Sequence, residues 1–79
     1  MLHDLPNDDS WLGAERRAIG DRIRIARLSR DLTQERVYLA AGVGRATFQK
    51  IEAGTSDARI STLLRIARVL GIHVADLLR

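Results

Sequence analysis

The sequence predicts a small all-α domain of five short helices. Its apolar residues recur at spacings of three and four rather than two, which is the period of a helix with one buried side. Glycines follow three of the periodic segments, where helices often end in a left-handed conformation. With 79 residues the chain has room for one domain and a modest core.

The first predicted helix is the longest and has the least certain beginning. It is expected to start between Ser10 and Ala18, because Gly13 and Gly20 weaken its early turns, and to end near Arg30 to Asp31. Its buried face is assigned to positions spaced i, i+4, i+7 and i+8, which are Ile19, Ile23, Ala26 and Arg27.

Two shorter helices are predicted next, on either side of a glycine turn. Thr33 is suited to cap the second helix, whose apolar face is assigned to Val37 and Ala40 and whose end is assigned to Gly42. The third helix is expected from about Arg45 to Glu52. Phe48 and Ile51, three residues apart, are expected to form its buried edge.

The last two helices follow an exposed loop from Thr55 to Arg59. The fourth helix is expected from Ile60 to Leu70 and ends at Gly71. The short fifth helix is expected from Val74 to Leu78, with Leu77 and Leu78 inward. The apolar face of the fourth helix is assigned to Ile60, Leu63, Leu64, Ile66, Ala67 and Leu70.

Charge is distributed unevenly along the chain. Residues 1 to 9 carry three aspartates and no cation, whereas the rest has thirteen cations, twelve of them arginine, and seven acids, for a net charge of +6. This excess fits an anionic partner, since arginine suits phosphate and guanine, although an arginine-rich composition from GC-biased coding would look the same. We expect an acidic tail at 1–9 without regular structure, and a domain at 10–79.

Composition also limits the location and the chemistry. There is no cysteine, hence no disulfide framework or thiolate metal site, and the two histidines have no ligand spacing. The longest apolar run, Val37 to Val43, is too short to cross a bilayer, and the acidic N-terminus is unlike a signal peptide. A cytoplasmic protein without cofactor, metal or membrane contact is expected. No nucleophile, His–carboxylate pair or glycine-rich phosphate loop supports an enzyme.

The second and third predicted helices carry the functional pattern. Two helices joined across Gly42 and Val43 have too few linking residues for an antiparallel hairpin and must cross steeply, as in a helix-turn-helix. Val37, Val43, Phe48 and Ile51 are apolar where the helices must meet each other and the core. The outward positions of the third helix are polar or cationic.

The chain resembles the lambda-repressor-like, or Xre-type, helix-turn-helix transcriptional regulators over residues 19–78. Four positions depart from the family pattern: Tyr38 replaces a small alanine where the motif helices approach, Asp31 replaces a glycine, and Arg59 and His73 replace capping serines. The first leaves open a wider crossing or an outward Tyr38. The segments that carry the resemblance are Ile19–Arg24 with Arg27, Leu32–Glu35, Ala41–Val43, Ile51–Gly54, Leu63–Ala67 and Leu70–Gly71.

The resemblance implies residues that contact duplex DNA. Gln34, with Thr33, stands where the family contacts a phosphate, and the loop residues Gly54, Thr55 and Ser56 are candidates for further phosphate bonds. Arg45 has the reach for a bidentate bond to guanine. Each could instead be an ordinary surface residue, or in the case of Arg45 a phosphate contact. The candidate base contacts on the third helix are Arg45, Ala46, Gln49 and Lys50, of which Ala46 offers only a methyl group and Lys50 could equally contact phosphate.

Two further pairs of residues have expected structural roles. The resemblance implies a buried ion pair between Arg27 and Glu52, which fall on otherwise apolar faces. Trp11 either covers the core of its own domain or, with Leu12, contacts a second subunit. The apolar end around Val74, Leu77 and Leu78 is the other candidate contact.

The expected function is that of a sequence-specific DNA-binding regulator, a repressor or autoregulator, acting as a homodimer on an inverted-repeat operator. Because the sequence ends just after the fifth helix, no separate sensing or dimerisation domain is expected. The alternative is an antitoxin, or another regulator of the same fold, that binds a protein partner as well as its operator. The acidic tail or Trp11 would then contact that partner.

Overall fold

The computed structural model describes residues 9–79 and has five helices and no strand in that range. The predicted all-α, five-helix fold is confirmed. The tail predicted for residues 1–9 lies outside the described residues except for Asp9, as does His3. The helices are α1 (Ser10–Ser29), α2 (Gln34–Ala41), α3 (Arg45–Ala53), α4 (Ile60–Leu70) and α5 (Ala75–Leu78).

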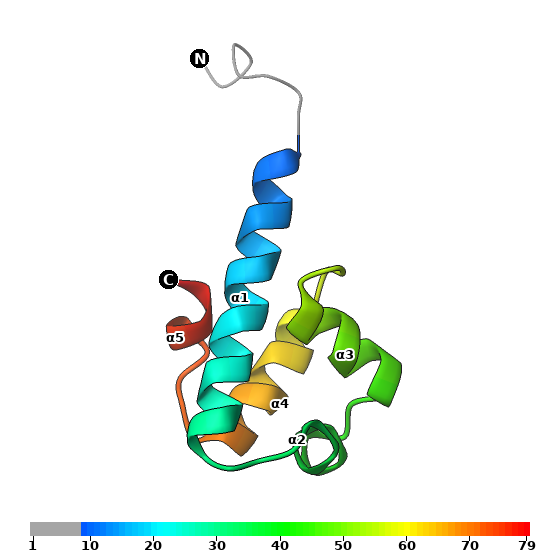
Figure 1. Ribbon diagram of the computed structural model, residues 1–79, viewed down its shortest axis with the longest axis vertical. Coiled ribbons are helices and arrows are strands. Elements are labelled where there is room, and N and C mark those ends of the chain that lie inside the picture. Colours follow the sequence, from blue (N-terminus) through cyan, green and yellow to red (C-terminus); the bar gives the residue numbers. More distant parts are fainter. Residues whose placement is uncertain (1–8) are drawn as a thin grey trace.

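Helix α1 forms the long axis of the molecule, and the other helices pack around its C-terminal two-thirds (Figure 1). It contacts α3 and α4 on one side and the short α5 on the other, and its first turns extend beyond them. Helix α2 packs on α3 and α4 near the C-terminal end of α1. Helix α1 begins at Ser10, the earliest position in the range predicted from the sequence.

A single apolar core lies between the helices. Every helix contributes to it, and α2 to α5, with 4 to 11 residues each, are too short to be stable without this packing. Its ten buried residues are Ile23, Val37, Ala41, Phe48, Ile51, Leu63, Ile66, Ala67, Leu70 and Leu77. Tyr38 also packs against this core, with its ring centroid 6.2 Å from that of Phe48. The small residue typical of the family is thus replaced by an aromatic contact.

The turn between α2 and α3 has the predicted helix-turn-helix geometry. The Thr33 hydroxyl accepts a hydrogen bond from the Arg36 N–H at 3.1 Å and caps α2. Gly42 ends α2 with φ 70°, a conformation that suits glycine, and the Val43 N–H donates to the Tyr38 carbonyl at 2.9 Å. Asp31 likewise adopts a positive φ of 55° after α1.

Four apolar residues predicted to be buried are exposed. In α2 the buried alanine is Ala41, and Ala40 is exposed. In α4 the buried stripe is narrower than predicted, because Ile60 lies at the edge of the first turn and Leu64 lies to one side of the stripe; they are 61% and 49% exposed. In α5 Leu77 is fully buried, and its neighbour Leu78, one position round the helix, is 45% exposed.

Helix α1 approaches the end of α3 closely at Gly20. A Cβ atom placed on Gly20 would lie 2.4 Å from the carbonyl oxygen of Glu52 and 2.8 Å from that of Ile51. Both are backbone atoms, which cannot rotate away as a flexible side chain could. The contact between α1 and α3 therefore requires glycine at this position.

We expect Gly20→Ala to destabilise the protein by about 1–3 kcal/mol, because the added methyl group forces α1 away from α3. Gly13→Ala is the matched control, since its Cβ would meet only the end of the Arg17 side chain, at 3.4 Å. That substitution should stabilise α1 by about 0.5–1 kcal/mol through helix propensity. Urea unfolding of the two variants measures the difference. Equal stabilities would show that α1 does not rest on the α3 backbone.

Candidate nucleic-acid interface

The outward face of α3 presents the four predicted base-contact residues together. Arg45, Ala46, Gln49 and Lys50 are all exposed, and they lie opposite the buried Phe48 and Ile51. None of the three polar side chains among them has a hydrogen-bond or ion-pair partner within residues 9–79. These groups are therefore available to a ligand without the loss of an internal contact.

The N-terminus of α2 forms a second part of this surface. The Thr33 hydroxyl uses one lone pair for the cap and keeps its own proton, and the first N–H groups of α2 have no intrahelical acceptor. A helix N-terminus of this kind favours an anion. The half-buried Gln34 is the first residue of the helix, so its backbone N–H belongs to this group.

A buried ion pair joins α1 to α3 and holds Gln34 in place. The Nε and Nη2 atoms of Arg27 donate to the two carboxylate oxygens of Glu52 at 3.0 and 2.8 Å. The Nη1 atom of Arg27 donates to the Leu32 carbonyl at 2.9 Å, and the Gln34 amide donates to Glu52 Oε1 at 3.1 Å. One carboxylate thus links α1, the start of α2 and α3.

The environment of Arg27 keeps its side chain charged. The hydrogen bond to Glu52 raises the pKa of the Arg27 guanidinium above its ordinary value, with a smaller contribution from the charge of Glu52, and burial opposes both. The stabilisation linked to this shift is present at every pH below the ordinary arginine pKa, and is lost only as the pH rises through the higher value. Arg27 therefore stays positively charged although it is buried within the domain.

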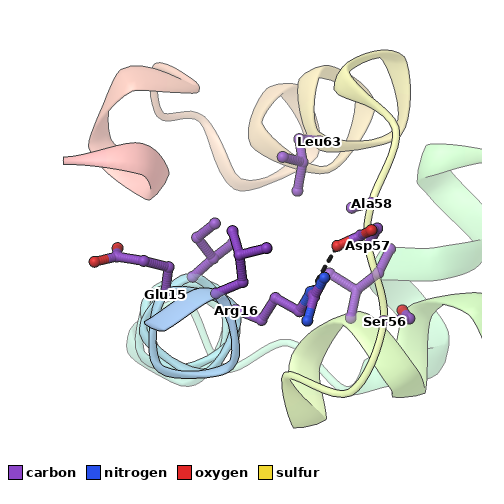
Figure 2. Close-up of a pocket in the computed structure, with 9 residues that line it drawn as sticks. Glu15, Arg16, Ser56, Asp57, Ala58 and Leu63 are labelled. Atoms are coloured by element: carbon purple, nitrogen blue, oxygen red, sulfur yellow. Dashed lines mark hydrogen bonds and ion pairs between the residues drawn. The ribbon is translucent and has the colours of Figure 1, made fainter. Parts of the chain in front are cut away.

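The loop after α3 is held against α1 by a second, exposed ion pair. Arg16 points from α1 toward Asp57 and donates to it at 2.6 Å, beside a small, mostly apolar pocket (Figure 2). Gly54 is buried against Arg17, and its N–H donates to Ile51. The Thr55 N–H and hydroxyl both donate to the Lys50 carbonyl. Of the three predicted loop residues, Ser56 keeps its polar groups unpaired within residues 9–79.

The sequence pattern did not reveal two of these contacts. The Arg16–Asp57 pair joins residues 41 positions apart, and neither residue has a feature that distinguishes it from other surface charges. The bond between Gln34 and Glu52 could have been inferred once the Arg27–Glu52 pair was expected, because Gln34 begins the adjacent helix.

The structure separates the candidates for a subunit contact. Trp11 is 62% exposed, so it does not cover the core of its own domain. Leu12 is half-buried and lines the pocket between α1 and α4. At the other end, Leu77 is fully buried and cannot contact a second subunit, whereas Leu78 can. The assignment of Leu77 to that contact is therefore wrong.

Seven cations of the described residues have no partner of their own. The cations without a hydrogen-bond or ion-pair partner in residues 9–79 are Arg17, Arg36, Arg45, Lys50, Arg59, Arg65 and Arg68. Within the same range no three histidine or acidic residues are grouped as a metal site would require. No helix in it is long and apolar enough to span a membrane.

Comparison with known proteins identifies the family. The sequence profile of a family described as helix-turn-helix matches residues 23–77, which include α2, α3 and the turn between them. The chain belongs to the Xre-type, lambda-repressor-like helix-turn-helix family. The match begins four residues later and ends one residue earlier than the span of the sequence resemblance.

Individual proteins resemble the chain in sequence and in structure. The cryptic phage CTXphi transcriptional repressor RstR of Vibrio cholerae is 38% identical over 56 residues, which are 71% of this chain; the match spans half the length of that relative. The restriction-modification controller protein C.AhdI from Aeromonas hydrophila superposes with a TM-score of 0.78 at 26% identity, over 81% of this chain and 97% of that protein. The clp gene regulator ClgR from Corynebacterium glutamicum has a TM-score of 0.76 at 26% identity, over 81% and 68%.

Glu52→Ala should destabilise the fold by about 3–5 kcal/mol, because it leaves Arg27 as a buried cation without its carboxylate. Glu35→Ala removes an exposed carboxylate from the first turn of α2 and serves as the control, with an expected cost below about 1 kcal/mol. Thermal and urea unfolding measure both. A Glu52→Ala variant that melts with the parent protein would show that the ion pair adds nothing to the fold.

Proposed function

We propose that the protein is a sequence-specific regulator of transcription that binds duplex DNA and inserts α3 into the major groove. The observation that carries this proposal is the set of unpaired polar side chains on α3 beside the anion-binding start of α2. A helix fits the major groove, where base edges present distinct patterns of donors and acceptors. Arg45, at the first turn of α3, is assigned to a guanine.

The other contacts follow from what each residue can still donate. Gln49 and Lys50 are assigned to base edges, with Lys50 also able to reach phosphate, and Ala46 to an apolar contact such as a thymine methyl group. Thr33 and Gln34 are assigned to a phosphate at the start of α2. In the loop after α3, Ser56 offers the free hydroxyl, while Gly54 and Thr55 shape the backbone that approaches the next phosphate.

Repression is the favoured outcome of binding. The matching relative from Vibrio cholerae is named as a transcriptional repressor, and the two structural neighbours are named as a controller protein and a gene regulator. None of these three names is that of an antitoxin or an enzyme, so the partner-binding alternative receives no support from them. A regulator of this kind acts in the compartment that contains the DNA, in line with the expected cytoplasmic location.

A two-fold homodimer on an inverted repeat is part of the proposal. One α3 covers only a few base pairs, and a second copy about one helical turn of DNA away, roughly 34 Å, would read the other half-site. The charge of the described surface is compatible with contacts to several phosphates.

Binding to duplex DNA should depend steeply on salt, because each neutralised phosphate releases counterions. With about six phosphate contacts the affinity should fall roughly 10³-fold between 50 and 200 mM salt. Selection from random duplexes, followed by titrations at several salt concentrations, measures both preference and slope. Failure to enrich any sequence at any salt concentration would contradict specific recognition.

Arg45→Ala should weaken binding to the selected sequence by about 1–3 kcal/mol and relax the preference at one base pair. Lys50→Ala is the comparison from the same face, since a phosphate contact by Lys50 would weaken binding to all sequences alike. Competition titrations with selected and random duplexes separate the two effects. If Arg45→Ala lost the same affinity for both kinds of duplex, Arg45 would not be a base contact.

A further inference from the structure

The face of α1 that points away from the domain carries an apolar stripe along its whole length. Trp11, Ile25 and Leu28 are 62%, 63% and 56% exposed, while the buried residues of α1 lie on the opposite side. The outer stripe consists of Trp11, Ala14, Ala18, Ile25 and Leu28, with Asp21 as its one polar member; all are exposed except Ala18, which is half-buried. Large apolar side chains gathered on one exposed face of a helix favour a protein contact there.

The stripe has the spacing of a helix-pairing seam. Trp11, Ala18 and Ile25 are seven residues apart, and a second row at Ala14, Asp21 and Leu28 follows the first by three. Two such rows are the a and d positions of a heptad repeat, which pack against a second helix with the same spacing. Helix α3 lies on another side of α1, and α5 borders the stripe, since Arg22 donates to the Leu77 carbonyl and Ile25 lines a shallow pocket with residues of α5. Ile25 itself remains exposed, so the seam is open to a second helix within residues 9–79.

We propose that this stripe pairs with the same stripe of a second copy, with the two α1 helices antiparallel about a two-fold axis. In this arrangement each row faces the other row of the second helix. Trp11 then lies opposite Leu28 of the second copy, and Ala14 opposite its Ile25. A large residue packs beside a small one in the inner layer, and the largest side chain covers each end.

The centre of the pairing contains Ala18 opposite Asp21 of the second copy. Asp21 is held by Arg24 of its own chain at 3.0 Å, so its charge is partly compensated. A polar residue at one central seam position lowers stability but disfavours shifted registers, in which it would face a large apolar side chain. The small Ala18 leaves room for it.

The charges along the edges of the stripe favour the antiparallel arrangement. Glu15 and Arg22 lie on one edge, and an antiparallel pair places Glu15 of each copy beside Arg22 of the other. Arg22 is half-buried and donates from Nη1 to the Leu77 carbonyl at 3.0 Å, and its other guanidinium N–H groups have no partner within residues 9–79. A parallel pair would instead bring Arg17 beside Arg22 of the other copy, two cations together.

The residues on the other edge of the stripe, Arg17 and Arg24, disfavour the antiparallel pair only weakly. The pairing brings Arg17 toward Arg24 of the second copy, but the charge of Arg24 is already compensated by Asp21 of its own chain. One helix pair of five turns buries less than the roughly 800 Å² per partner of a standard interface, so the free dimer should be weak and should be completed on DNA. The proposal rests on the proposed function for that last step alone.

The first test measures the dimer without DNA. Sedimentation equilibrium should show a monomer–dimer equilibrium for the parent chain, which Ile25→Asp weakens at least about tenfold by placing a charge in the seam. Leu39→Asp is the matched control, because Leu39 is 67% exposed on α2, outside the stripe, and should leave the equilibrium unchanged. A parent chain that remains monomeric at millimolar concentration, or equal behaviour of the two variants, would overturn the proposal.

The second test fixes the orientation by exchanging charges. A chain with Glu15→Arg pairs arginine with arginine in its own dimer, and a chain with Arg22→Glu pairs two glutamates. Each alone should dimerise about tenfold more weakly than the parent, whereas a mixture of the two should recover the dimer, since both edge pairs become oppositely charged. Circular dichroism of each variant verifies its fold.

A mixture no more dimeric than its components would overturn the antiparallel pairing. The outcome is independent of the proposed function, because no DNA is present in either test. A chain that dimerises as described but selects no DNA sequence would contradict the proposed function and leave this inference standing.

Discussion

The position of α3 depends on one buried ion pair. Arg27 and Glu52 are the only buried charged residues within residues 9–79, and removing two charges from water is costly unless their geometry and remaining hydrogen bonds compensate. Here the pair is bidentate, Arg27 also reaches the Leu32 carbonyl, and Glu52 also accepts from Gln34. The same carboxylate therefore orients the helix that carries Arg45 and the residue assigned to a phosphate.

Two glycines make this link possible by letting α1 lie directly on the end of α3. Besides Gly20, whose Cβ would meet the Glu52 carbonyl, Gly54 has no room for one, because it would lie 2.6 Å from the Cα atom of Arg17. Close packing at this end brings Arg27 within reach of Glu52, and it leaves the other side of α1 uncovered. The packing of α1 on α3 therefore both fixes the position of the α3 surface and leaves the outer stripe of α1 exposed.

Local signals in the sequence predicted the helix ends and most of the core. Thr33 and Gly42 have capping chemistry that depends on neighbouring residues alone, and the resemblance to the family supplied the pairing of Arg27 with Glu52. The phase of the shorter helices was less accessible. Ala41 is buried and Ala40 exposed, Leu77 is buried and Leu78 exposed, and only packing against distant residues decides between such neighbours. The repeat of Trp11, Ala18 and Ile25 every seven residues is visible in the sequence. It indicates a contact with a second helix only once the structure shows which side of α1 the other helices cover.

The central claim is that the surface organised by this ion pair is the one that meets DNA. Amide chemical-shift mapping of the labelled protein, titrated with a duplex from the selection, tests it most directly. We expect the largest shifts at the start of α2, along the outward face of α3 and at the loop around Ser56, with α1 from Trp11 to Ala18 responding only where a second copy binds. Shifts centred on α4 and α5, with α3 unaffected, would contradict the account.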